Sequence, residues 1–382
     1  LPEEVGMFLS PAGPITANGN GAFGVQSVVQ TDSGLALGGL FSIAANGNGA
    51  DGVQSIVTVD SGLALGALFD ITANGNGADG INAVNNANHG VAIGVAGSTA
   101  NLAEIVELGT EVASLFGLDL PLAITSQGHM EANGNSGVGF RMTTTGSNAA
   151  VNAVVGLDTL GNSDAGTFLG TYSDNLSIAA LARLYTAENV GAGLLFDAYG
   201  LNTGAIGVLA DVFADVNGDS GITASVDSPN GFAALLALST DVLRPLAADL
   251  GADFLGGAIH IPGASFGPLV ASGNTGDGFN AHVTGNDFAA ALFLDTVADG
   301  NSGNGFNLNV ASSNGPAILA MVSSDVALEV VNALDLLPDP IYFNPVGLNS
   351  ASGNGTNGVL ANVNGGDGAY AALVGLTSDN NT

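Results

Sequence analysis

The sequence predicts an all-β protein folded as a parallel β-helix (β-solenoid) of about ten 27–28-residue coils, with three helical insertions on one side. Three observations predict this fold. Nearly identical decapeptides begin at Ile15, Ile43 and Ile71, a spacing of 28 residues. A glycine recurs at the same phase along the chain, and an alternating apolar run follows each of these glycines. A repeat of this length is typical of solenoids, in which successive coils stack on one another.

The recurring glycine, called here the landmark glycine, marks the coils. It falls at Gly24, Gly52, Gly80, Gly139, Gly166, Gly193, Gly221, Gly278, Gly305 and Gly358. Six of the nine intervals are 27 or 28 residues, and the others are 59, 57 and 53. The three long intervals equal one coil plus an insertion of about 25–31 residues.

The first strand of each coil follows its landmark glycine and alternates apolar with polar residues. This alternation places one set of side chains inside the coil and the other outside. The predicted core comprises Val25, Val53, Ile81, Phe140, Phe196, Phe279, Phe306 and Val359. Columns of apolar residues that repeat once per coil describe strands stacked in register, about 4.8 Å apart.

A second strand follows about ten residues later, as in "GLALGGLF" and "GFAALLAL", and a short third segment such as "ITA" precedes the next corner. Three strands per coil complete the parallel β-helix. The second strand is apolar on both faces, so its outer face predicts an apolar strip along the molecule. A lone soluble protein seldom leaves such a strip exposed.

The repeated "NGNG" stretch reads as a corner of the coil. Gly19, Gly47 and Gly75 supply backbone angles that residues with a Cβ avoid. The asparagines one residue later are expected to stack as a ladder, with each side-chain amide bonding to the next coil. The predicted ladder residues are Asn20, Asn48, Asn76 and Asn135.

The coils from Ile15 to Leu376 resemble right-handed parallel β-helix proteins, the architecture of pectate lyases, phage tailspikes and many secreted adhesins. The resemblance rests on coil length and ladder pattern, without a family-specific motif. The corner "GNGADG" also faintly resembles the calcium-binding nonapeptide of RTX proteins. That motif needs a nine-residue period and regular Asp, and this chain has neither. No cofactor is therefore expected, with calcium as the alternative.

The three insertions, near 99–129, 240–267 and 324–348, all leave the coil just after the second strand. Helical spacing of apolar residues predicts helices over 101–117, 240–255 and 324–337. Asn101 and Glu104 fit an N-cap and its third-position carboxylate. We expect the three helices on one side of the solenoid, over the apolar strip.

The composition excludes several partners. The formal net charge is −31, with 34 acidic side chains against 3 Lys and Arg together, so nucleic-acid binding is not expected. No apolar run approaches the about 18 residues of a membrane helix, so membrane insertion is not expected. The chain has no cysteine and starts at Leu1, which suggests a processed secreted product on the cell surface or outside the cell.

No catalytic constellation is visible. Arg141, Arg183 and Arg244 are far apart in coil order, and the histidines show no ligand spacing. Asp197 and Asp215 form no dense carboxylate column with other residues. The chain is therefore not expected to be an enzyme, although two glycosidase carboxylates could still meet across coils.

The predicted organisation is an extension over 1–14, which is either a cap or a subunit contact, one solenoid domain over 15–376 and a tail over 377–382. The functional hypothesis is a secreted structural protein that assembles with itself head to tail into an extracellular filament or surface layer. The predicted contact residues are Leu1, Met7, Phe8, Ile15, Val359, Tyr370 and Leu373. The alternatives are a carbohydrate-active β-helix enzyme, a tailspike-like binder of a cell-surface glycan, and a monomeric adhesin stalk.

Overall fold

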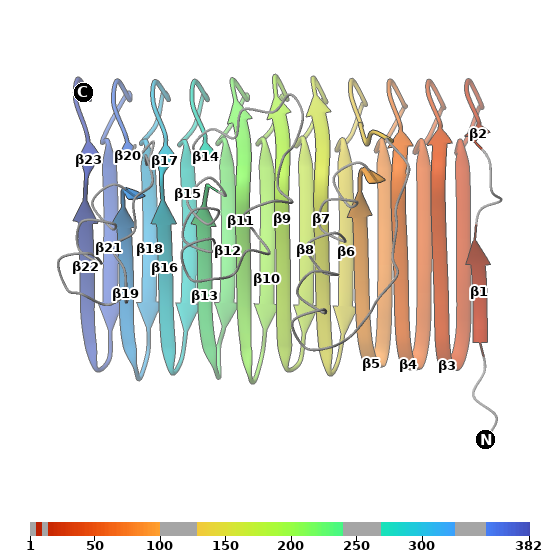
Figure 1. The fold of residues 1–382 in the computed structure, drawn as a ribbon, viewed down its shortest axis with the longest axis horizontal. Coiled ribbons are helices and arrows are strands. Elements are labelled where there is room, and N and C mark those ends of the chain that lie inside the picture. Colours follow the sequence, from red (N-terminus) through yellow and green to blue (C-terminus); the bar gives the residue numbers. More distant parts are fainter. Residues whose placement is uncertain (1–4, 10–13, 100–127, 240–268, 325–348) are drawn as a thin grey trace, which may run out of the picture.

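The computed structural model describes residues 5–9, 14–99, 128–239, 269–324 and 349–382. Within them the chain forms an all-β parallel solenoid of about ten coils, which confirms the predicted architecture (Figure 1). The coils stack along the long axis of the molecule, and the first and last described strands lie at its opposite ends (Figure 1). Equivalent strands of successive coils form three stacks, called here the first, second and third columns.

Three long strands pass through the first two columns without a break: β3 (Val25–Ala44), β4 (Val53–Thr72) and β5 (Ile81–Gly97). The other strands of the first column are β6 (Phe140–Gly146), β8 (Thr167–Ser173), β10 (Leu194–Gly200), β12 (Ile222–Ser228), β15 (Phe279–Gly285), β18 (Phe306–Ser312) and β21 (Val359–Gly365). The second column continues with β1 (Val5–Leu9), β7 (Ala149–Leu160), β9 (Leu176–Ala187), β11 (Gly204–Asp215), β13 (Phe232–Leu238), β16 (Phe288–Leu294), β19 (Pro316–Val322) and β22 (Gly368–Val374). The third column contains β2 (Ile15–Thr16), β14 (Leu269–Val270), β17 (Thr296–Val297), β20 (Asn349–Ser350) and β23 (Leu376–Thr377). The last residues of β3, β4, β7, β9 and β11 also belong to this column.

Every strand pairs in parallel with its equivalent one coil away. Val25 pairs with Val53, Val53 with Ile81, and Ile81 with Phe140, so the pairing continues in register across the first insertion. The sequence repeat therefore becomes a stack of equivalent residues. A shift of one residue would exchange the inner and outer side chains of a strand, so the alternating pattern determines the register.

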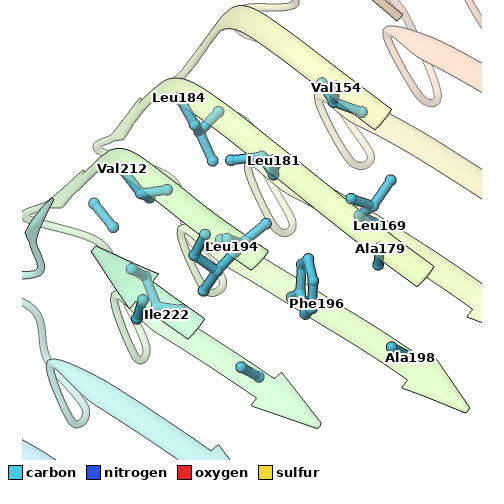
Figure 2. Close-up of a cluster of buried hydrophobic side chains, with 14 of the residues drawn as sticks. Val154, Leu169, Ala179, Leu181, Leu184, Leu194, Phe196, Ala198, Val212 and Ile222 are labelled. Carbon is cyan, nitrogen blue, oxygen red and sulfur yellow. The ribbon is translucent and has the colours of Figure 1, made fainter. Parts of the chain in front are cut away.

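The interior of the coils is a continuous apolar core. Among the predicted core residues, Val53, Ile81, Phe140, Phe196, Phe279 and Phe306 are at most 2% exposed. Val25 and Val359 are only partly buried, because each lies in the outermost described strand of the first column. Figure 2 shows Leu194 and Phe196 of β10 among the surrounding leucines of β9. The rings of Phe279 and Phe306 stack with centroids 5.2 Å apart.

The chain leaves for all three insertions between the second and third columns. The last described residues before the gaps are Thr99, Ser239 and Ser324, and the chain returns at Gly128, Leu269 and Asn349. Asp70 fixes the point at which the chain leaves for the first insertion, because its carboxylate accepts hydrogen bonds from Thr99 N at 2.7 Å and from Thr99 Oγ1 at 2.6 Å. The three departures thus share one corner of the coil.

The helical part of the fold prediction is not supported. Almost all of 101–117, 240–255 and 324–337 lies outside the described residues, and the described ranges contain no complete helix. Amphipathic spacing alone does not establish a helix, because packing supplies most of the stability of a short helix in a protein.

The first and last described segments belong to the coil pattern. In the predicted extension, β1 pairs with Leu35–Gly39 and so adds a strand to the second column. In the predicted tail, Thr377 lies in β23, and Thr382 N donates to Asn354 O at 3.3 Å. These last residues form the corner that follows the final third-column strand.

Replacing Phe279 by Ala should lower the free energy of unfolding by about 3–5 kcal/mol, because the ring is buried against Phe293 and Phe306. Phe213→Ala is the matched control, since this ring is 38% exposed and should cost clearly less. Urea denaturation followed by circular dichroism measures both losses. Equal losses would contradict the core assignment.

Candidate functional site

The predicted asparagine corner is a ladder of side-chain amides. Asn20 Nδ2 donates to Asn48 Oδ1 at 2.9 Å, Asn48 Nδ2 to Asn76 Oδ1 at 3.0 Å, and Asn76 Nδ2 to Asn135 Oδ1 at 2.9 Å. The backbone N–H of each donor residue bonds to the same oxygen, at 2.9–3.0 Å. Asn48, Asn76 and Asn135 are buried, whereas Asn20 lies exposed in the first described corner.

The ladder continues beyond these four residues along the whole solenoid. Side-chain amides bond in the same way, at 2.9–3.1 Å, through seven more asparagines. They are Asn162, Asn189, Asn217, Asn274, Asn301, Asn354 and Asn381. A simple sequence signal locates them up to Asn354: each lies four residues before a landmark glycine.

The landmark glycines are explained by this ladder. A Cβ built on Gly24 would lie 2.6 Å from Asn48 Nδ2, and one on Gly305 would lie 2.7 Å from Asn354 Nδ2. The same clash, at 2.5–2.7 Å from the amide of the next coil, recurs at every landmark glycine. Any side chain at this position would displace the amide, so the glycine and the asparagine are required together.

The ladder has a direction. In every coil the backbone N–H and one side-chain amide hydrogen of the asparagine point toward the C-terminal end, and Oδ1 points toward the N-terminal end. In five coils the second amide hydrogen bonds back to a carbonyl oxygen of the preceding coil. Asn20 Oδ1 therefore receives no amide from a described residue. At the other end, Asn381 Nδ2 donates only to Ser378 Oγ within the described chain, at 3.0 Å. The two ends of the ladder are thus complementary, with an acceptor at one and donors at the other.

The structure places the predicted contact residues at the two ends of the solenoid. Met7 is 59% exposed and Phe8 43%, at the N-terminal end. Tyr370 is 59% exposed and Leu373 46%, at the C-terminal end. Two others, Ile15 and Val359, are partly buried against the core, and Leu1 lies outside the described residues.

A polar face that sequence reasoning missed lies on the outside of the first column. Two neighbouring rows of outward side chains run across successive coils and form it, and we call it the tyrosine face. One row is Asp197, Ser225, His282 and Asn309. The other row is Asn86, Thr145, Tyr172, Tyr199, Asp227 and Thr284. Only the strand register brings these residues together, because they are far apart in the chain.

Hydrogen bonds join the two rows. Tyr172 Oη donates to Asp197 Oδ2 at 2.8 Å, and Ser225 Oγ donates to Asp227 Oδ2 at 2.5 Å. Burial raises the pKa of Asp197; the Tyr172 hydrogen bond lowers this pKa and the charge of Asp227 raises it. Burial, followed by the hydrogen bond to Asp197, raises the pKa of Tyr172 well above its usual range. The phenol therefore stays protonated as a donor.

His282 continues this network. Its Nδ1 lies 2.7 Å from Asn309 Nδ2, and its Nε2 lies 2.7 Å from Thr284 Oγ1. An amide nitrogen can only donate, so Nδ1 accepts the bond from Asn309. Asn362 Nδ2 donates to Asn309 Oδ1 at 2.9 Å, which agrees with this amide orientation. The sequence gives no sign of this network, because the histidines show no ligand spacing.

A hollow of about 230 Å³ adjoins the tyrosine face. Asn86, Thr145, Tyr172, Tyr199 and Asp174 line it, together with neighbouring small and polar residues. Within the described chain, the side chains of Asn86, Thr145, Tyr199 and Asp174 make no hydrogen bond. Their polar groups are therefore available to a ligand.

Most other charged groups have structural partners. Arg141 Nε lies 2.8 Å from Asp79 Oδ2, and its guanidinium lies 5.1 Å from the centroid of the Phe168 ring. His129 Nε2 lies 3.1 Å from Asp158 Oδ2. Over the described ranges, no group of three or more His, Asp and Glu side chains could hold a metal ion. In the same ranges, no helix has the length and apolar character needed to cross a membrane.

These observations define the chain as a parallel β-solenoid protein with a continuous asparagine ladder. Comparison with protein-family models, with curated proteins and with solved structures gives no significant match.

Replacing Asn189 by Ala should destabilise the protein strongly. The change leaves the Asn162 N–H and one hydrogen of the Asn162 amide without their acceptor. It also removes the side-chain donor of Asn217 Oδ1, which keeps only the backbone N–H of residue 189. Each buried unsatisfied group costs about 1–3 kcal/mol, so we expect a loss of about 3 kcal/mol or more. Asn202→Ala is the matched control, because the bonds of this side chain are exposed: it donates to Asp174 O at 2.7 Å and accepts from Asn230 Nδ2 at 3.2 Å. Equal shifts in thermal unfolding would contradict a stabilising ladder.

Replacing Asp215 by Asn should raise the melting temperature at neutral pH. Burial raises the pKa of Asp215 above 3.8, although the Val216 N–H partly offsets this effect. The folded state therefore disfavours the ionised carboxylate. The contribution of Asp215 to the stability of the fold is fully present below its unfolded pKa, and it is lost as the pH rises through its folded pKa. The gain of the variant should shrink as the pH falls toward 4 in thermal scans. Asp219→Asn controls for the overall charge, and an equal gain there would contradict the assignment.

Proposed function

We propose that this chain is a structural protein of the cell exterior that assembles with itself, head to tail, into a filament or surface layer. The observation that carries the proposal is the complementarity of the two ends of the solenoid. A parallel solenoid has two different ends, so contact between them joins unlike surfaces and does not close on itself. Such contacts produce filaments.

The C-terminal end supports the proposal through its exposed backbone and core. Among described strands, β21, β22 and β23 each pair on one side only, with β18, β19 and β20. Leu373 is 46% exposed, whereas its partner one coil earlier, Met321, is fully buried. Unpaired strand edges and an open core both favour addition of another strand layer.

The N-terminal end presents the opposite edges. β1 and β2 pair with β3 on one side, and no described strand covers their other side. Phe8 occupies the inward position of Gly38, yet it is 43% exposed. This end therefore also exposes apolar side chains that a further coil would bury.

The column positions of the two ends match. Counted through the register, Met7 lies in the column of Tyr370 and Phe8 in the column of Ala371. Ile15 likewise lies in the column of Leu376. A second copy stacked in this register would place its Phe8 ring over a small alanine.

The ladder would continue across the same junction. Asn20 lies five residues after Ile15, as Asn381 does after Leu376. Asn381 N–H and Nδ2 would then donate to Asn20 Oδ1 of the next copy, as each asparagine does within the chain. This bond supplies direction and register to an otherwise apolar contact.

The first column would contribute less to the junction. The second column has one strand more than the first, since β1 precedes β3 there and no described strand precedes Val25–Thr31 in the first column. When β22 of one copy stacks on β1 of the next copy, a slot the width of one strand is left in the first column. This slot lies between β21 of the first copy and Val25–Thr31 of the next copy. The contact would rest on the second and third columns and the ladder.

Purified protein should form long unbranched filaments in negative-stain electron microscopy without any added ligand. Leu373→Asp should leave single particles, because it puts a charge into the second-column contact. Leu360→Asp should still form filaments, although Leu360 is 48% exposed in the same last coil, because it borders the slot. Size-exclusion chromatography with light scattering gives the masses. A strictly monomeric wild type, or equal effects of the two variants, would contradict the proposal.

A further inference from the structure

The tyrosine face has the chemistry of a ligand site independent of the two ends. Tyr172 and Tyr199 are register partners on adjacent strands, and both side chains are half-buried. A tyrosine ring has an apolar face and a polar edge, and tyrosines are therefore common in recognition surfaces. On one side of the rings lies the hollow, and on the other side lie Asp197 and Asp227.

The charges around this face exclude anionic ligands. Asp174 lines the hollow, and Asp197 and Asp227 flank the tyrosines. His282 Nε2 lies 3.8 Å from Asp227 Oδ1, so this ring adjoins a carboxylate and does not stand as a separate cationic site. The three carboxylates would repel a phosphate or carboxylate ligand, which also agrees with the net charge of −31.

The unpaired polar groups of the hollow distinguish between a cationic ligand and a neutral one. An ammonium group has donors only and would use the carboxylates alone. Asn86 and Thr145 offer both donors and acceptors that no described residue uses, and so does the Tyr199 hydroxyl. Hydroxyl groups of a ligand both donate and accept, so they match this mixed lining better.

We propose that the tyrosine face binds a neutral polyhydroxylated ligand, namely one or a few sugar units of a glycan. Tyr172 and Tyr199 contact the apolar face of a sugar ring, and Asn86, Thr145 and Asp174 bond to hydroxyls of the unit that enters the hollow. The hollow, about 230 Å³, is smaller than the usual pockets for drug-sized ligands, which suits a single sugar unit. Further units extend along the strand rows toward Asp227.

Isothermal titration of the full chain tests this proposal. The probes are short neutral oligosaccharides of glucose, mannose or N-acetylglucosamine, with oligogalacturonate as the anionic probe and oligolysine as the cationic probe. We expect at least one neutral probe to bind and oligogalacturonate not to bind. Tyr199→Ala should weaken that binding by about tenfold, and Tyr199→Phe should weaken it less. Tyr185→Ala is the matched control, since this 42% exposed tyrosine packs near Phe213 outside the tyrosine face.

Several outcomes would overturn the proposal. Failure of every neutral probe to bind at millimolar concentration would do so, as would equal weakening by Tyr185→Ala. Binding of oligolysine alone would assign the face to a cationic partner instead. Circular dichroism of each variant verifies the fold, and Tyr199→Phe serves where the alanine variant does not fold. The result is independent of filament formation, because none of these residues lies at the ends.

Discussion

The buried asparagine ladder is the interaction on which the rest of the structure depends. An amide inside a protein costs about 1–3 kcal/mol for each group left unpaired, so every coil must present its asparagine opposite the next one. Apolar packing alone would tolerate slippage between coils by two residues. The ladder removes that freedom. It also explains the landmark glycines, since the amide of the next coil occupies the space where their Cβ would lie.

The ladder also gives the molecule a direction that the apolar core lacks. One amide hydrogen of each asparagine points one way along the axis and its Oδ1 the other, across the direction in which the strands run. The two ends are therefore chemically different, and each suits the other better than itself. The proposed head-to-tail assembly follows from this polarity. The tyrosine face lies on the side of the solenoid, so a filament would repeat it along its length.

Local signals explain how much of the fold was predictable. Alternation around Val53 or Phe306 depends on neighbours in the chain, and the coil length is visible from "ANGNG" alone, so strands, core and corner could be read directly. The tyrosine face could not be recognised in the same way. Tyr172 and Asp197 are 25 residues apart, and only the register together with the side-chain directions brings them within hydrogen-bonding distance. The helical insertions were predicted from spacing that packing must also support.

The sequence by itself determined the coil length, the phase of each strand and the pairing of glycine with asparagine, because these repeat locally and each copy constrains the next. Only the tertiary structure decided which outward side chains meet, because insertions of unequal length separate neighbouring coils in the chain. It also decided the unequal strand numbers of the first and second columns, because Val5–Leu9 carries no corner motif and is placed only by its pairing with Leu35–Gly39.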